Sequence, residues 1–324
     1  MVKLASAEMA EKKLATRAAF GATLAELAEE GVPVVAVDAD LTGSTTTKKF
    51  AAAAPENADK LFNCGIAEQN MIDVAAGLAL TGHVAYTGSF AVFGTGRAYD
   101  QIRNTVCYSN LDVKICPTHA GVSVGPDGGS HQMLEDVSLM RGLPNMRVLV
   151  PADYAAARAA IKLAAKTPGP VYVRMGRAAV PCVYDDDVEL EIGRAYVLRE
   201  GSDVTVVACG VEIREALAAA DMLAEEGVSI EVIDAFSVKP LDEGTITASV
   251  AKTGCCVVAE EHSVHGGLGS AVAECLARKN PAPCEFVGVQ DRFGKSGEFE
   301  ELLGYFNLDA AAIVEAVKRA RGRK

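Results

Sequence analysis

Short runs of consecutive apolar residues, separated by stretches with helical periodicity, constrain the fold of this chain more than any other feature. The runs begin with PVVAVD at residues 33–38 and continue as far as CCVVAEE at residues 255–261. A strand that is apolar on both sides is buried on both faces, as in a parallel sheet covered by helices. The spacing of apolar residues also predicts one amphipathic helix over residues 7–30. The sequence therefore predicts an α/β fold with doubly wound, mainly parallel sheets.

A polar, acidic stretch, YDDDVELE at residues 184–191, interrupts this alternation of strands and helices. The alternation restarts with the apolar run VTVVACG at residues 204–210. At 324 residues the chain is long enough for two domains of about 150 residues each. We therefore expect one α/β domain over residues 1–185 and a second over residues 191–324.

The charge and composition of the chain argue against several classes of partner. The 31 basic and 43 acidic residues give a net charge of −12, which disfavours nucleic acid and anionic membranes as main partners. No apolar run approaches the roughly 18 residues of a membrane span, and the start of the chain lacks the apolar core of a signal peptide. Nine cysteines without a C-x-x-C pair are typical of reduced thiols. We expect a soluble cytoplasmic protein whose anionic ligands are held by a local basic cluster.

Several unusual residues of the first domain follow the ends of predicted strands. Ligands of open parallel sheets bind outside the carboxyl ends of the strands, and these ends meet at one edge of the sheet. The residues are Asp38, Asp40 and Ser44 after the first strand, Ser89 and Phe90 after the second, His119 after the third, and Arg174 at the end of the last. The sequence therefore predicts a binding site at this edge.

Glu68 and two phenylalanines each allow a structural and a functional interpretation. Glu68 lies in the first turn of a predicted helix, where a carboxylate stabilises the helix dipole by ~0.3–1 kcal/mol. That helix is rich in alanine and glycine, which suits close packing and would bury Glu68. A buried carboxylate is costly to keep charged unless a neighbour donates a hydrogen bond to it. Phe90 and Phe93 are either core residues or a flat platform for a heteroaromatic ring.

The segment from His119 to His131 contains four glycines and predicts a functional loop. Its spacing of His119, Asp127 and His131 matches no common metal site, and neutral histidines suit sugar hydroxyls and proton transfer better. In the second domain, His262 and His265 precede another glycine-rich helix start, which can bind anions. Because the sequence contains neither a Walker nor a dinucleotide fingerprint, a structural loop between the domains is favoured there.

Together these motifs resemble the carboxyl-terminal half of the thiamine diphosphate enzymes of the transketolase group, over nearly the whole chain. GIAEQNM is similar to the family's glutamate motif, and TGSFAVF is similar to its aromatic motif. The resemblance implies that Glu68 contacts the aminopyrimidine of the cofactor and that Phe90 and Phe93 contact its rings. VDADLTGS is similar to the motif that would place Asp40 near the cofactor and Ser44 near a substrate phosphate.

The remaining motifs imply a sugar phosphate as substrate. THAGVSVGPDGGSHQ matches the family's loop for donor and acceptor sugars, so that His119, Asp127 and His131 would bind substrate. The resemblance makes Glu68, His119 and His131 catalytic, and it assigns no metal ligand to this chain. Arg174, in VYVRMGR, falls where the family has a phosphate-binding arginine.

The resemblance also implies a partner subunit. Full-length transketolases carry a GDG motif and a downstream asparagine that hold the diphosphate and magnesium, and the nearest string here, GPDGGS, belongs to the sugar loop. The chain therefore resembles the C-terminal subunit of a two-chain transketolase (EC 2.2.1.1-like), which transfers a two-carbon ketol unit from a ketose phosphate to an aldose phosphate. A separate N-terminal subunit would hold Mg²⁺ and the diphosphate in an α2β2 heterotetramer, and the chain alone would be inactive.

Three alternatives stay open at this point. Deoxyxylulose-phosphate synthase has a similar glutamate motif, but that family tends to have arginine near position 119 and to keep both halves in one chain. The beta subunit of a 2-oxo acid dehydrogenase is also a partner-dependent half and would act on a lipoyl carrier. A non-catalytic sugar-phosphate-binding protein would have no use for a buried, ring-activating Glu68.

Overall fold

The computed structural model describes residues 2–324 and contains two large sheets. The first sheet has the strand order β12-β6-β7-β5-β4-β2-β3, and all its neighbouring pairs are parallel except β12 with β6. Its strands are β2 (Val34–Asp38), β3 (Leu61–Asn63), β4 (Val84–Gly88), β5 (Val113–Ile115), β6 (Arg147–Leu149), β7 (Val171–Val173) and β12 (Ser237–Lys239).

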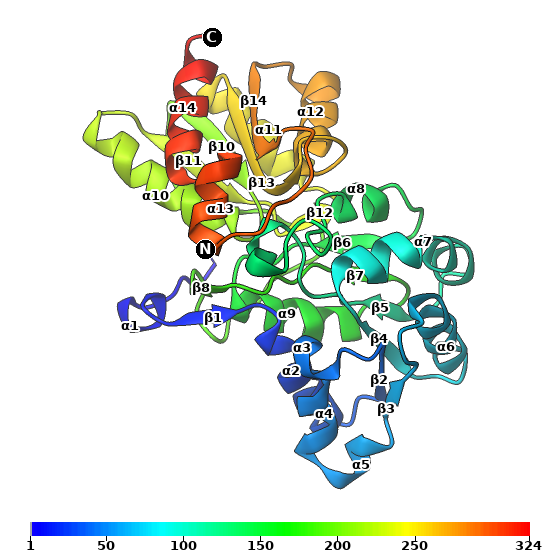
Figure 1. Cartoon of the computed structure of the whole chain (residues 1–324). Helices are drawn as coiled ribbons and strands as arrows, with labels where there is room; N and C mark the ends of the chain where they lie inside the picture. Colours follow the sequence, from blue (N-terminus) through cyan, green and yellow to red (C-terminus); the bar gives the residue numbers. More distant parts are fainter. Residues whose placement is uncertain (1) are drawn as a thin grey trace.

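Helices cover both faces of this first sheet (Figure 1). One face packs against α2 (Ala18–Glu29) and α9 (Tyr154–Ala165), and the other against α6 (Glu68–Leu80). Shorter helical elements lie in the connections between the strands of this sheet. They are α3 (Thr42–Thr45), α4 (Thr47–Ala53), α5 (Pro55–Ala58), η1 (Val92–Arg97), α7 (Tyr99–Gln101), η2 (Ile102–Cys107), η3 (Val122–Asp127) and α8 (Asp136–Arg141).

The second sheet forms the other lobe, drawn in yellow-green to red above the first in Figure 1, and has the order β14-β13-β10-β11-β9. Only β9 runs antiparallel to its neighbour. Its strands are β9 (Tyr196–Arg199), β10 (Val204–Ala208), β11 (Ile230–Asp234), β13 (Cys256–Ser263) and β14 (Cys284–Val289). Its helices are α10 (Glu212–Glu225), α11 (Glu243–Thr253), α12 (Leu268–Lys279), α13 (Phe299–Phe306) and α14 (Ala310–Arg321).

The predicted α/β class with mainly parallel, doubly wound sheets is confirmed, and the two sheets lie on either side of residues 184–191 with one exception. Strand β12 comes from the second half of the sequence yet pairs with β6, so it completes the sheet of the first. None of the helices within residues 2–324 is long and apolar enough to cross a bilayer. All nine cysteines are free thiols.

The predicted single helix over residues 7–30 is wrong. The segment contains α1 (Ala7–Ala10), then β1 (Lys13–Ala15), and only then α2. Strand β1 pairs antiparallel with β8 (Ala179–Pro181), and next to it the Thr16 hydroxyl accepts a hydrogen bond from the backbone N–H of Gly176 at 2.7 Å. This pairing with a distant strand overrides the local helical spacing.

Candidate active site

Glu68 is buried at the start of α6, at the carboxyl edge of the first sheet. Its side chain is 2% exposed, and its Oε2 accepts a hydrogen bond from Arg97 Nη1 at 2.8 Å. Arg97 ends η1, a π-helical segment, and its guanidinium lies 4.7 Å from the centre of the Phe93 ring. Wide π-helical turns occur frequently at functional sites. The buried carboxylate thus has the donor that the sequence argument required.

The two phenylalanines form a platform beside the two histidines of the glycine-rich loop. The rings of Phe90 and Phe93 are stacked with centres 6.3 Å apart, and the ring of His119 stacks on Phe90 at 3.8 Å. His131 meets Phe93 edge-on at 5.5 Å. Phe90 is fixed because the backbone beyond β4 continues to pair with Thr118. The structure therefore brings together the aromatic motif and the ends of the predicted sugar loop.

His119 is held as a neutral imidazole. It is 2% exposed and adopts a left-handed backbone conformation with φ 61°, and its Nδ1 lies 2.7 Å from the Thr118 hydroxyl. Burial lowers the pKa of His119 to about 3, and the neighbouring Arg17, Arg177 and His131 act in the same direction. A neutral imidazole can accept a proton or a hydrogen bond from a ligand hydroxyl.

Arg17 and Arg177 form a basic pair beside His119 that the sequence analysis did not single out. Arg17 Nη1 donates to the backbone oxygen of Ser44 at 2.8 Å, and Arg177 Nη1 donates to that of Val124 at 2.6 Å. Burial and the charge of Arg177 lower the pKa of Arg17, while Asp127 opposes the shift. Ser44, Asp127 and the two arginines therefore share one region. The two arginines form a local basic cluster within an otherwise acidic protein.

Arg174 lies in the contact between the two domains. Its Nε lies 2.7 Å from Asp136, and its Nη2 donates to the backbone oxygen of Glu261 at 3.0 Å. Burial alone would lower the pKa of Arg174, but Asp136 and Glu261 raise it above its ordinary value. This geometry does not support the phosphate-binding role expected of Arg174, because its donors are engaged by buried carboxylates. Arg177, three residues further along the same motif, is the arginine that approaches His119.

Two aspartates shape the turn after β2. Asp38 is fully buried and accepts hydrogen bonds from the backbone N–H of Leu41 at 2.6 Å and from two threonine hydroxyls. Burial raises the pKa of Asp38, and these donors oppose the shift. Asp40 is exposed, has φ 64°, and accepts a hydrogen bond from Asn63 at 3.2 Å. Asp38 therefore has a structural role, and it holds the turn that presents Asp40 and Ser44 at the edge of the sheet.

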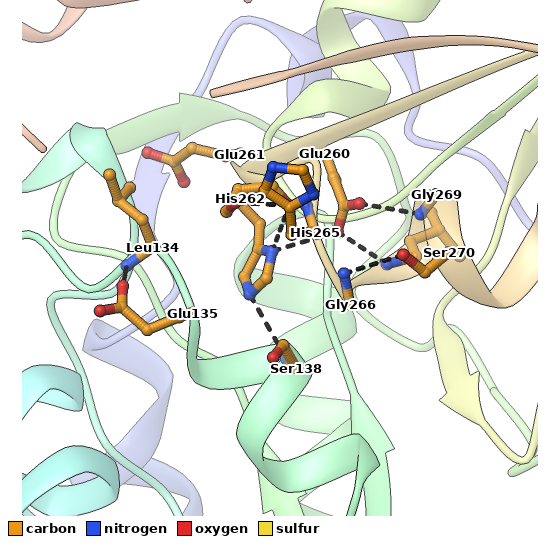
Figure 2. Close-up of polar contacts among 12 residues, drawn as sticks. Leu134, Glu135, Ser138, Glu260, Glu261, His262, His265, Gly266, Gly269 and Ser270 are labelled. Carbon is orange, nitrogen blue, oxygen red and sulfur yellow. Dashed lines mark hydrogen bonds and ion pairs between the residues drawn. The ribbon is translucent and has the colours of Figure 1, made fainter. Parts of the chain in front are cut away.

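The loop around His262 connects the domains, as expected (Figure 2). The Glu260 carboxylate accepts hydrogen bonds from the backbone N–H groups of Leu268 at 2.7 Å and Gly269 at 2.8 Å, so it occupies the N-terminus of α12. His262 Nε2 accepts a hydrogen bond from the N–H of Ser138 in the first domain at 3.4 Å. This helix start is therefore filled by the protein's own carboxylate. In the described range, residues 2–324, no three His, Cys, Asp or Glu side chains gather closely enough to hold a metal ion.

Two family models match the chain. One describes the transketolase pyrimidine-binding domain and matches residues 12–183; the other describes the transketolase C-terminal domain and matches residues 193–313. A putative transketolase C-terminal section of Methanocaldococcus jannaschii is 45% identical over 93% of this chain and 94% of its own length. A 6-deoxy-6-sulfo-D-fructose transketolase subunit of Clostridium sp. is 42% identical over 93% of this chain and 92% of its own length.

Longer relatives and solved structures agree with these matches. Human transketolase is 37% identical over 94% of this chain, which spans 49% of its length. The structure of a split-gene transketolase, described as an inactive β4 tetramer, has a TM-score of 0.87 and 49% identity, and the match covers 96% of this chain and 99% of that one. A Pichia stipitis transketolase in complex with sedoheptulose 7-phosphate has a TM-score of 0.78 at 22% identity, which shows the shared fold.

Proposed function

Since the chain belongs to the transketolase family, over both its pyrimidine-binding and C-terminal domains, we propose that it is the C-terminal subunit of a split transketolase. In this role it transfers a two-carbon ketol unit from a ketose phosphate to an aldose phosphate in the cytoplasm. One observation carries the proposal. A buried carboxylate, an aromatic platform and two histidines meet beside a basic pair at the carboxyl edge of the first sheet.

The family implies dependence on thiamine diphosphate, and the residues at this edge fit the pyrimidine part of that cofactor. The planar Arg97 guanidinium already packs on the Phe93 ring while donating to Glu68, so a planar N–H donor is accommodated there. Glu68 would hydrogen-bond the aminopyrimidine, Phe90 and Phe93 would contact its ring, and Asp40 would lie nearby. When bound, the cofactor supplies an electron sink for the two-carbon unit.

The glycine-rich loop supplies the groups that would handle the sugar hydroxyls. Neutral His119 would accept a hydrogen bond or a proton from a hydroxyl, because its pKa of about 3 keeps it uncharged. His131, edge-on to the Phe93 ring, would move a proton on the other side of the reacting carbon. Asp127 lies beside these groups and would accept a hydrogen bond from a further hydroxyl.

The basic pair would bind the terminal phosphate of the sugar. A phosphate monoester carries ~−1.5 to −2 charge at neutral pH, and two arginines with a serine hydroxyl suit it well. Arg17, Arg177 and Ser44 provide this set. A sulfonate would also be accommodated, and the Clostridium relative is named for a sulfonated ketose. A sulfonated ketose is therefore a second candidate donor.

A separate N-terminal subunit would complete the site by holding the diphosphate and Mg²⁺ in an α2β2 assembly. Two facts support this proposal. The chain spans about half of human transketolase, and the similar split-gene protein is described as an inactive tetramer of β chains. We therefore expect the isolated chain to lack transfer activity.

A coupled assay of two-carbon transfer from xylulose 5-phosphate to ribose 5-phosphate tests the proposal. It contains thiamine diphosphate and Mg²⁺, with this chain alone, with the N-terminal subunit alone, and with both. Activity in the mixture only supports a split transketolase, and activity of this chain alone contradicts it. A mixture that binds the cofactor but acts only on a 2-oxo acid with a lipoyl carrier would assign the chain to the dehydrogenase alternative.

A further inference from the structure

The glycine-rich loop carries His119, Asp127 and His131, but part of its shape is set by the second domain. The Glu261 carboxylate, at the end of β13, accepts a hydrogen bond from the backbone N–H of Ser123 at 2.5 Å. The same carboxylate lies directly against Gly121, where a Cβ atom would overlap it. Gly121 also has φ 81°, a conformation that glycine adopts without strain. The loop therefore packs directly against the Glu261 side chain of the other domain.

A second contact between the domains holds the far end of the loop. Gln132 is 4% exposed, and its Nε2 donates to the backbone oxygen of Val122 at 3.1 Å and to that of Lys295 at 2.9 Å. Its Oε1 accepts from the backbone N–H of Lys295 at 2.8 Å. One amide thus ties the loop to itself and to the 294–297 segment, which comprises Gly294, Lys295, Ser296 and Gly297.

Backbone packing along the 294–297 segment reinforces this contact. A Cβ atom built on Gly129 would lie 2.6 Å from the backbone oxygen of Gly294, and one built on Gly125 would lie 3.3 Å from that of Gly297. Glycines at these places let the two backbones approach within contact distance. The segment therefore runs along the loop from Gly125 to Gly129, next to Asp127.

The Glu261 carboxylate is itself kept in place by charge. It is 2% exposed, and Arg174 Nη1 lies 3.6 Å from its Oε2. Arg174 is in turn paired with Asp136 on α8. Burial raises the pKa of Glu261, and Arg174 and the Ser123 N–H oppose this shift by stabilising the charged carboxylate.

We infer that Glu261 and Gln132 are positioning residues through which the second domain fixes the glycine-rich loop, and with it His119 and His131. The second domain supplies none of the predicted substrate contacts, yet through these two residues it would affect the sugar site. Its consequence for catalysis rests on the proposed function, whereas its structural content can be tested without any activity.

Hydrogen–deuterium exchange of the full chain provides the structural test. Gln132→Ala removes the links between the loop and Lys295, and we expect amide exchange in residues 121–132 to become about tenfold faster or more. Exchange in β10 and β11 should stay as in the wild type. Gln290→Ala is the matched control, because Gln290 is exposed and donates only to the backbone oxygen of Gly288. It should leave exchange of the loop unchanged.

Milder variants keep the test decisive if an alanine variant loosens the whole chain. Gln132→Glu keeps the size of the side chain and an acceptor for Lys295 but loses the hydrogen bonds that Nε2 donates, so exchange in the loop should still accelerate. Glu261→Ala should accelerate exchange at Ser123, and Glu261→Gln, which retains an acceptor, should restore much of the protection. Exchange in the loop at the wild-type rate in both Gln132 variants would overturn the inference.

The complex with the N-terminal subunit provides the functional test. If the two residues position the loop, Gln132→Glu should raise the KM for sugar phosphates several-fold and leave cofactor affinity, measured by calorimetry, unchanged. An equal loss of sugar and cofactor binding would indicate a general structural role and would contradict the inference. If the complex proves to have no transfer activity, the proposed function fails, and the exchange measurements still decide whether the second domain holds the loop.

Discussion

Replacing Arg174 should lower the stability of the fold, because the structure pairs this residue with the buried carboxylates of Asp136 and Glu261. The motif, in contrast, assigns Arg174 to a phosphate site. Arg174→Met keeps the bulk of the side chain and removes the cation that lies between Asp136 and Glu261, which are 0% and 2% exposed. Removing one partner from a buried ion pair typically costs ~3–5 kcal/mol, because the other charge stays buried without compensation. We expect a loss of this size in the free energy of unfolding.

Urea denaturation of the isolated chain measures this loss. Arg199→Met is the matched control, because Arg199 pairs with Asp221 at the surface, where the side chains are 35% and 78% exposed. An exposed pair contributes about 0–1 kcal/mol, so the control should lose no more than that. A loss below about 1 kcal/mol in Arg174→Met, together with a raised KM for sugar phosphates in the complex, would refute this reasoning. Arg174 would then be assigned to the phosphate site.

Three further outcomes are expected. Glu68→Gln should reduce turnover of the reconstituted complex by about 100-fold or more without weakening subunit association in size-exclusion chromatography, and near-normal rates would remove Glu68 from the cofactor site. Arg17→Met and Arg177→Met should each raise the KM for phosphorylated sugars by ~1–3 kcal/mol equivalent and spare an unphosphorylated ketose; equal effects on both would exclude a phosphate contact. Burial raises the pKa of Asp234 from 3.8 to about 7, so the folded state binds this proton more tightly and stability should fall as pH rises from about 4 to 7. Urea midpoints of Asp234→Asn should depend less on pH across that window, and an unchanged profile would contradict the shift.

The two sheets could be predicted because their signal is local. A parallel strand buried on both faces is a continuous apolar run, and β2, β10 and β13 each stand out in the sequence for that reason. Strands whose pairing depends on distant residues gave no such signal. The sequence of β1 has helical spacing, and its strand conformation depends on pairing with β8. Strand β12 is only three residues long and joins the sheet of the other domain.

The site could be predicted where a residue type is unusual in its local context. Glu68 begins a helix of small residues, and His119 and His131 bracket a run of glycines. These features can be recognised from the sequence alone. Arg17 lies in an ordinary helix start, and nothing local distinguishes it from other surface arginines. Arg174 and Arg177 are three residues apart in one motif, so the sequence does not distinguish their roles. The fold shows that Arg174 pairs with the buried carboxylate of Asp136.

The exposure of the side chains also bears on where the proposed N-terminal subunit would bind. His119 is 2% exposed, and Glu261 and the 294–297 segment lie behind its loop, although Asp127 of the same loop is exposed. The other end is open, because Arg97, which covers Glu68, is 48% exposed. We expect the proposed N-terminal subunit, which would hold the diphosphate and its metal, to approach from this exposed side. We therefore expect the residues that face the partner to surround Arg97.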